Sequence, residues 1–415
     1  MHKFLIEGGR SLQGDIPVSG AKNAVLPIFT AALLAEDESV LEGVPELRDV
    51  FNLAQILESL GLKVNFTGQN NVVIDPSKLN AFEAPYELVR KLRASYYILG
   101  ALLGKVGQAR CALPGGDKIG NRGIDLHIKG FRALGAEVKL EHGIVEVKAN
   151  RLKGTKIYLD YPSVGATVNI MLAATLAEGE TVIENVAKEP EIIDLANYLN
   201  VMGANIKGAG TDVIKIKGVT ELHGTTHQII PDRIEAGTYM IAAAITRGDL
   251  FVRNMISEHL KSLIAKLKEM GCSVEEEIEG VRVKGAKFFK PVDIKTLPYP
   301  GFPTDLQPQM TSLLTQAEGI SLVIETVYDD RFHHIQELNR MGAEIKIDGR
   351  SALIKPARLS SAKVKATDIR AGAALILAGL VADGETEVSD IYHIQRGYEN
   401  IEDKLKGVGA RIKID

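Results

Sequence analysis

One short phrase recurs six times along the chain and constrains its fold more than any other feature. In each copy an amphipathic helical run ends at a glycine, and a short alternating strand follows, as in ILESLGLKV, FRALGAEVK and KLKEMGCSV. The copies lie about seventy residues apart, so the chain is predicted to consist of six copies of one structural unit. The six glycines are Gly61, Gly135, Gly203, Gly271, Gly342 and Gly409.

Each unit is predicted to contain two different helices. The first is apolar nearly all round, as in IMLAATLA and AALILAGLVA, which is typical of a helix that lies inside and is covered by sheet. The second is amphipathic and ends at the recurrent glycine, which suits a left-handed cap. The strands that follow alternate between apolar and polar residues. We therefore expect a mixed α/β fold with helices inside and sheets outside.

A chain of 415 residues is too long for one ordinary core. Three units plus three is more plausible than an open solenoid, because the chain lacks the polar capping repeats that a solenoid needs. We expect a two-domain inside-out α/β barrel of βαβαββ-type units, with joints near Ser19–Gly20 and near 231–237. The strand HKFLIEG precedes the first unit and is expected to pair with the C-terminal half. The expected domains are residues 21–229 and residues 1–20 plus 230–415.

Composition excludes several classes of protein. A net charge of -4 gives no electrostatic footprint for nucleic acid. Two cysteines, Cys111 and Cys272, argue against a disulfide framework and are expected to be buried apolar residues. No apolar run reaches the length of a membrane span, and no leader pattern opens the chain. We expect a soluble cytoplasmic protein, monomeric or weakly homo-oligomeric, that binds neither nucleic acid nor membrane.

The segment SGAKNAVLP (19–27) is predicted to start an apolar helix, with Ser19 or Gly20 as its cap. Lys22 and Asn23 then stand on the first turn, where a lysine opposes the helix dipole. An anion bound between the lysine and the helix start would remove that conflict. The alternative is a solvated lysine on a surface helix.

The segment LPGGDKIGNRGIDLH (113–127) is a glycine-rich loop around Asp117 and Arg122. It lacks the ending of a phosphate-binding P-loop. It is either a flexible surface loop or a lid that closes over a substrate.

The segment PYPGFPTDLQPQ (298–309) holds Asp305 among four prolines. A carboxylate on such a restricted loop is suited to act as a base or to anchor a hydroxyl, and the alternative is a helix-capping role. Four arginines are candidates for bidentate anion binding, with surface ion pairs as the alternative reading. They are Arg93, Arg331, Arg370 and Arg396.

Taken together, these segments resemble the enolpyruvyl transferases, in particular those that act on UDP-N-acetylglucosamine. The resemblance covers almost the whole chain and includes LVRKLRAS, IDLHIKGFRALGA, PSVGATVNIMLAATLAEGETVIENVAKEPEI, PDRIEAGTY and HIQRGYENIEDKL. It implies two three-unit domains with the ligands in the cleft between them. It also implies that the 3-hydroxyl of the sugar attacks C2 of phosphoenolpyruvate, that C3 gains a proton, and that phosphate is then eliminated. No metal and no cofactor are expected.

The resemblance also implies roles for individual residues. Phosphoenolpyruvate would be held by Lys22, Arg122 and Arg396, supplemented by Arg93, Arg331 and Arg370. The sugar would be held by Asn23, Asp305 and Val327, with Asp305 as the expected base. The site for the uridine diphosphate would be lined by Gly123, Ile124, Asp125, Leu126, Ser163, Val164 and Gly165.

Two positions depart from the usual pattern of the resembling family. Asp117 stands where most members have a cysteine, so we expect it to be the general acid, with a raised pKa in the closed site. Fosfomycin alkylates that cysteine, and we therefore expect the protein to be insensitive to it. Gly123 stands where a proline is common, and it is expected to make the loop on the nucleotide side of the site more flexible.

Two alternatives stay open at this point. One is the related transferase of shikimate phosphate, although the LPGGDKIGNR loop and PSVGAT favour the nucleotide sugar. The other is a non-enzymatic clamp of α/β units, which would need a basic lining.

Overall fold

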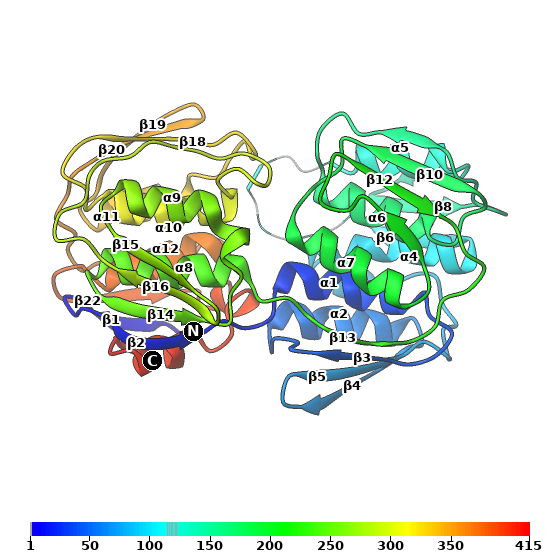
Figure 1. Ribbon diagram of the computed structural model, residues 1–415, viewed down its shortest axis with the longest axis horizontal. Helices are drawn as coiled ribbons and strands as arrows, with labels where there is room; N and C mark the ends of the chain where they lie inside the picture. Colours follow the sequence, from blue (N-terminus) through cyan, green and yellow to red (C-terminus); the bar gives the residue numbers. More distant parts are fainter. Residues whose placement is uncertain (1, 114, 116, 118, 121–122) are drawn as a thin grey trace. The chain divides into compact units, whose positions relative to one another are not determined.

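The computed structural model describes residues 2–113, 115, 117, 119–120 and 123–415. Its contacts divide the chain into two compact units (Figure 1). The described residues of 20–117 and 123–230 form one, here called the central unit. Residues 2–19, 119–120 and 231–415 form the other, here called the terminal unit.

Three apolar helices form the inside of the central unit, where α4 packs against both α1 and α6. In α6 every residue from Ala166 to Ala174 is buried, which confirms the interior position expected from its lack of a polar face. The inner helices are α1 (Lys22–Ala32), α4 (Tyr97–Val106) and α6 (Val164–Ala174). The amphipathic helices are α2 (Arg48–Ser59), α5 (Asp125–Ala133) and α7 (Pro190–Val201), and two short helices are α3 (Tyr86–Val89) and the 3-10 helix η1 (Arg93–Tyr96).

Three small sheets belong to the central unit, in the orders β13-β3-β5-β4, β6-β8-β7 and β11-β12-β10-β9. The third copy reads β9-α6-β10-α7-β11-β12, which is the βαβαββ order that the sequence predicted. The strands are β3 (Ser39–Glu42), β4 (Lys63–Gly68), β5 (Asn71–Asp75), β6 (Gln108–Ala112), β7 (Glu137–Glu141), β8 (Ile144–Lys148), β9 (Lys156–Tyr158), β10 (Glu180–Glu184), β11 (Asn205–Lys207), β12 (Val213–Lys217) and β13 (Thr226–Gln228).

The terminal unit repeats the same plan, and its three inner helices pack against one another. The inner helices are α8 (Arg233–Ile245), α10 (Gln307–Leu314) and α12 (Ile369–Gly379). The amphipathic helices are α9 (Lys261–Glu269), α11 (His333–Arg340) and α13 (Ile401–Gly407), and three 3-10 helices are η2 (Ser257–Leu260), η3 (Thr304–Leu306) and η4 (Ile394–Arg396).

The three sheets of the terminal unit include both N-terminal strands. β1 lies antiparallel between β22 and β23, and β2 runs parallel to β14, so HKFLIEG pairs with the C-terminal half as expected. The sheet orders are β15-β16-β14-β2, β17-β18-β20-β19 and β21-β22-β1-β23. The strands are β1 (Phe4–Glu7), β2 (Gln13–Pro17), β14 (Asp249–Arg253), β15 (Ser273–Glu277), β16 (Gly280–Lys284), β17 (Ile294–Lys295), β18 (Ser321–Ile324), β19 (Glu344–Asp348), β20 (Ser351–Lys355), β21 (Lys363–Lys365), β22 (Glu385–Ser389) and β23 (Arg411–Ile414).

The recurrent glycine ends the amphipathic helix of every copy in the left-handed region. All six have a positive φ, from 89° at Gly342 to 108° at Gly203. A side chain is disfavoured in that conformation, so the prediction of left-handed caps is confirmed.

Each unit has a hydrophobic core of its own, and the two sets of buried residues share no member. Both cysteines are buried, as expected. Among the described residues, no helix is long and apolar enough to cross a membrane.

Candidate active site

Asp305 is the centre of a charged cluster in the terminal unit. It lies on η3, directly before the inner helix α10. Its Oδ1 accepts a hydrogen bond of 2.8 Å from Arg331 Nη2, and its Oδ2 accepts bonds of 3.2 and 3.0 Å from Nε and Nη2 of Arg370. Asp305 does not cap α10, whose N-cap is Leu306, but it does stand at the helix start, in the first turn of η3, as the alternative interpretation had it.

The two arginines of this cluster are buried, with side-chain exposures of 4% for Arg331 and 5% for Arg370. Each also lies over an aromatic ring, Tyr328 at 5.2 Å and Tyr398 at 5.5 Å. Their alternative interpretation as surface ion pairs is therefore wrong. Arg331 Nε and Arg370 Nη1 are buried donors without a hydrogen-bond partner within the described part of the chain, so they can still bind an anion.

The charges of the cluster set the proton affinity of Asp305. Burial alone would raise the pKa of its carboxyl group, but Arg370 and Arg331 outweigh burial and hold that pKa well below its usual range. A carboxylate with so low a pKa is a weak proton acceptor. In this arrangement Asp305 suits the anchoring of a substrate hydroxyl better than the removal of its proton.

Lys22 begins α1 in the central unit and is buried, at 7% exposure. Its Nζ lies 2.7 Å from Oδ2 of Asp49, which is fully buried in the first turn of α2. The alternative of a solvated surface lysine is therefore wrong. Sequence reasoning missed Asp49, whose only local signal is its position at a helix start.

Ser19 and Gly20 do not cap α1. The N-cap is Ala21, without a side-chain hydrogen bond. Ser19 instead bonds to residues of the terminal unit, because its Oγ donates to Glu399 and its backbone N–H donates to Oε2 of Glu235 at 2.7 Å.

A third cluster surrounds the start of α6 in the central unit. Ser163 is the N-cap, and its side chain accepts a bond of 3.3 Å from Ala166 N–H. Gly165 leaves room for its neighbours, since a Cβ there would lie 2.2 Å from the hydroxyl of Tyr96 and 3.2 Å from Nε2 of His127. The start of a helix offers unpaired N–H groups to an anion such as a diphosphate.

His127 lies on α5 beneath this helix start and is neutral. Burial, with a smaller contribution from Arg93, lowers its pKa to about 3. Asn169 Oδ1 accepts from the N–H of Gly100 at 2.8 Å, so its Nδ2 faces His127 Nδ1 at 3.0 Å. Because Nδ1 then accepts, the ring proton belongs on Nε2. Sequence reasoning did not select His127, although it lies within the IDLHIK segment.

The remaining predicted residues lie at helix starts, in loops or outside the described chain. Asn23 is half-buried on the first turn of α1, and Arg93 lies on η1 over the ring of Tyr96 at 5.3 Å. In the segment before and into α5, Gly123 and Asp125 are exposed, while Ile124 and Leu126 are buried. Val164 begins α6, and Val327 is exposed after β18. Asp117 and Arg396 are half-buried. Arg122 lies outside the described residues.

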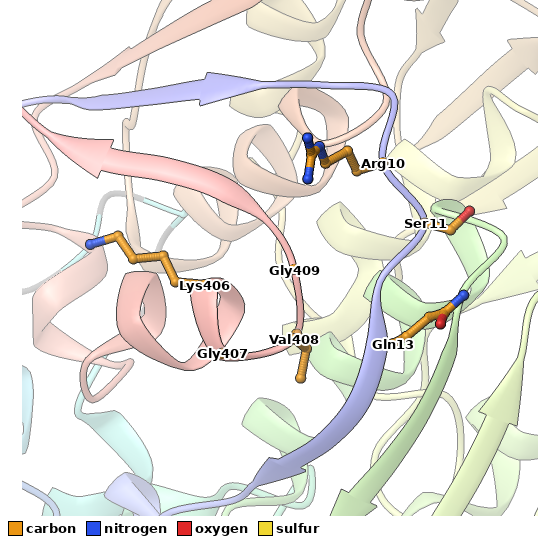
Figure 2. Close-up of a pocket in the computed structure, with 7 residues that line it drawn as sticks. All are labelled: Arg10, Ser11, Gln13, Lys406, Gly407, Val408 and Gly409. Carbon is orange, nitrogen blue, oxygen red and sulfur yellow. The ribbon is translucent and has the colours of Figure 1, made fainter.

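A surface hollow of about 560 Å³ also lies in the terminal unit, and none of the predicted site residues is among those that line it (Figure 2). Its charged lining residues are Arg10 and Lys406, and the Lys406 side chain extends away from Arg10 in Figure 2. Lys406 pairs with Asp403 at 3.3 Å. The hollow therefore lacks the convergent polar groups of a specific site. Within the described part of the chain, no three His, Cys, Asp or Glu side chains gather as metal ligands would.

The sequence matches known proteins over its full length. The family model of EPSP synthase (3-phosphoshikimate 1-carboxyvinyltransferase) matches residues 6–405. A UDP-N-acetylglucosamine 1-carboxyvinyltransferase of Halothermothrix orenii is 69% identical over 414 residues, which are 100% of this chain and 99% of that protein. UDP-N-acetylglucosamine 1-carboxyvinyltransferase 2 of Carboxydothermus hydrogenoformans is 58% identical, with coverage of 100% and 99%.

Solved structures of related proteins share the fold. The enolpyruvyl transferase NikO from Streptomyces tendae has a TM-score of 0.89 at 25% identity, over 100% of this chain and 98% of that chain. An EPSP synthase from Acinetobacter baumannii has a TM-score of 0.77 at 20% identity over 100% of both chains, which shows the fold alone. The inside-out α/β fold expected from the sequence is thus confirmed. Because both the family model and full-length relatives match it, the chain belongs to the EPSP synthase (3-phosphoshikimate 1-carboxyvinyltransferase) family of enolpyruvyl transferases.

Proposed function

We propose that this protein transfers the enolpyruvyl group of phosphoenolpyruvate to the 3-hydroxyl of UDP-N-acetylglucosamine and releases phosphate. The observation that carries this proposal is the 69% identity, over 100% of the chain, to a relative named for that activity. The reaction would be the first committed step in making peptidoglycan precursors, and it would take place in the cytoplasm.

The reaction is an addition followed by an elimination. The sugar hydroxyl gives up its proton as its oxygen forms a bond to C2 of phosphoenolpyruvate, and C3 takes up a proton. The tetrahedral adduct then loses a proton from C3 and expels phosphate, which restores the double bond. The transfer is therefore balanced without an oxidant or a reductant.

Phosphoenolpyruvate carries a phosphate and a carboxylate, so its site needs several fixed cations. We assign this work to Lys22, Arg122 and Arg396, supplemented by Arg93, Arg331 and Arg370. The burial of Lys22, Arg331 and Arg370 supports the assignment, because charges with little exposure interact strongly with a bound anion. The unpartnered Nε of Arg331 and Nη1 of Arg370 support it further.

The sugar and the nucleotide would use the remaining residues. Asp305 would accept a hydrogen bond from the attacking hydroxyl, and Asn23 and Val327 would hold the rest of the sugar. The starts of α5 and α6 would receive the uridine diphosphate through backbone N–H groups. These segments comprise Gly123, Ile124, Asp125, Leu126, Ser163, Val164 and Gly165.

Asp117 would deliver the proton to C3. A carboxylic acid ordinarily has a pKa near 4, so this role requires a raised pKa once both substrates are bound. The role is therefore expected only in the loaded enzyme.

The runner-up acceptor is shikimate 3-phosphate, because the matching family model carries the name of that enzyme. The solved EPSP synthase is only 20% identical to this chain, so the nucleotide sugar is favoured. A non-enzymatic clamp has no support among relatives that are named as transferases.

Two measurements test the proposal. Calorimetry should detect binding of UDP-N-acetylglucosamine to the protein alone. Phosphate should then appear when phosphoenolpyruvate is added, and no phosphate should appear when shikimate 3-phosphate replaces the nucleotide sugar. Release of phosphate with shikimate 3-phosphate only would reverse the assignment.

A further inference from the structure

We infer that Glu325 is a positioning residue for this reaction: it fixes Asp305 and Val327, the two proposed sugar contacts of the terminal unit, relative to each other. The inference rests on the proposed function. Glu325 follows β18, is 1% exposed, and does not belong to any of the segments assigned to substrate.

One oxygen of the Glu325 carboxylate organises the segment that holds Val327. Oε1 accepts hydrogen bonds from the backbone N–H of Val327 at 2.8 Å and from that of Tyr328 at 3.1 Å. It also accepts one of 2.8 Å from the hydroxyl of Thr296. The loop after β18 is thereby tied to the segment that leads into the proline-rich loop.

The other oxygen, Oε2, is linked to Asp305 by hydrogen bonds that pass through Thr304 and Arg331. Oε2 accepts a bond of 2.9 Å from the hydroxyl of Thr304. Because that hydroxyl donates to Glu325, its oxygen is free to accept from Arg331 Nη1 at 3.1 Å. Arg331 in turn donates from Nη2 to Asp305 at 2.8 Å. Arg331 can only donate, so Thr304 must accept from it, and Glu325 supplies the acceptor that leaves the Thr304 oxygen available for that bond.

These contacts indicate that Glu325 orients the two loops and does not merely fill space. Both oxygens of Glu325 accept from neutral donors, two hydroxyls and two backbone N–H groups. Burying a carboxylate costs stability, so a residue needed only to fill this space would be better apolar. What the carboxylate supplies is a set of acceptors that fixes the loop of Asp305 and the loop of Val327 together.

The sharpest test is Glu325→Gln, which keeps the shape of the side chain. The amide oxygen should take the place of Oε1, since the alternative would face three donors with an NH₂ group. The NH₂ group then donates to Thr304, so the bond from Thr304 is reversed and the bond from Arg331 is weakened. We expect KM for UDP-N-acetylglucosamine to rise about tenfold, with kcat changed by less than about threefold.

A second pair of variants tests the same path without touching Glu325. Thr304→Val removes the hydroxyl and is expected to raise KM for the nucleotide sugar about as much as Glu325→Gln. Thr304→Ser restores the hydroxyl and should recover most of the lost affinity. The double variant Glu325→Gln with Thr304→Val should be no worse than either single variant, because both break one path.

The matched control is Glu279→Gln, at an exposed carboxylate in the turn between β15 and β16, which should leave both KM values unchanged. Turnover of the wild-type protein is measured first. If the wild type releases no phosphate, the proposed function is wrong, and the role of Glu325 is not the cause. With active wild-type protein, a normal KM in both Glu325→Gln and Thr304→Val would overturn the inference. So would additive effects in the double variant. If Glu325→Gln fails to fold by its melting profile, the comparison of Thr304→Val with Thr304→Ser decides alone.

Discussion

Lys22 and Asp49 show how a single charge is held in place at the scale of one residue. Lys22 begins an inner helix, where its charge is unfavourable, and the 2.7 Å contact with the buried carboxylate of Asp49 compensates for this. The pair fixes the position of a cation that we propose binds phosphoenolpyruvate.

We expect Asp49→Asn to impair both stability and function. Removing one member of a buried pair leaves an uncompensated charge, and the free energy of unfolding should fall by roughly 3 kcal/mol. Without the ion pair to Asp49, the Lys22 ammonium is held less firmly in position, so KM for phosphoenolpyruvate should rise. Denaturant unfolding and steady-state kinetics check the two effects. A variant with wild-type stability and wild-type KM would show that the pair is unimportant.

Asp117 leads to a second prediction at this scale. The wild-type protein should resist fosfomycin, because Cys111 and Cys272 are both buried and burial raises the pKa of the Cys111 thiol to about 12. Asp117→Cys should become sensitive and form a covalent adduct, which mass spectrometry can detect.

The control for this experiment is Asp117→Ala, which should lose most of its turnover and stay unmodified. Full turnover of Asp117→Ala would exclude the role as general acid. An adduct on the wild-type protein would contradict the expected resistance.

At the scale of elements, one amide holds three helices of the central unit together. Asn169 on α6 accepts from Gly100 on α4 and faces His127 on α5. The N–H of Gly100 near the start of α4 donates to Asn169 Oδ1 at 2.8 Å, and this bond ties α6 to α4. The same amide fixes the tautomer of His127 beneath the start of α6.

This arrangement predicts a pH dependence of stability. The pKa of His127 is about 3 in the folded protein, against about 6.5 when unfolded, so the unfolded state holds the extra proton between these values. Stability contributed by the neutral ring is therefore present above about pH 6.5 and is lost as pH falls toward 3. Between about pH 6 and about pH 5, His127→Asn should lose about 1 kcal/mol less stability than the wild type. Denaturant unfolding at both pH values checks this, and equal losses would contradict the neutral, buried ring.

At the scale of the whole molecule, the repeat made the fold predictable. The six glycines and the apolar helices carry local signals, so the caps, the inner helices and the unit order followed from the sequence. The residues that contact the candidate site residues could not be predicted from the sequence. Asp49, Glu325 and Asn169 meet Lys22, Thr304 and His127 only through tertiary packing, and no local pattern marks such a meeting.

The two separate cores predict that the units can be destabilised independently. Calorimetry of Asp49→Asn should show a lower melting temperature for one transition, that of the central unit, and an unchanged temperature for the other. Equal shifts of both transitions, or a single cooperative transition, would show that the two units unfold together.

The central claim concerns the group transferred and its acceptor, and the mass of the product tests it most directly. After incubation with phosphoenolpyruvate and UDP-N-acetylglucosamine, the nucleotide sugar should gain the mass of one enolpyruvyl group, with one phosphate released per product. An unchanged nucleotide sugar, together with an enolpyruvyl product formed from shikimate 3-phosphate, would contradict the account.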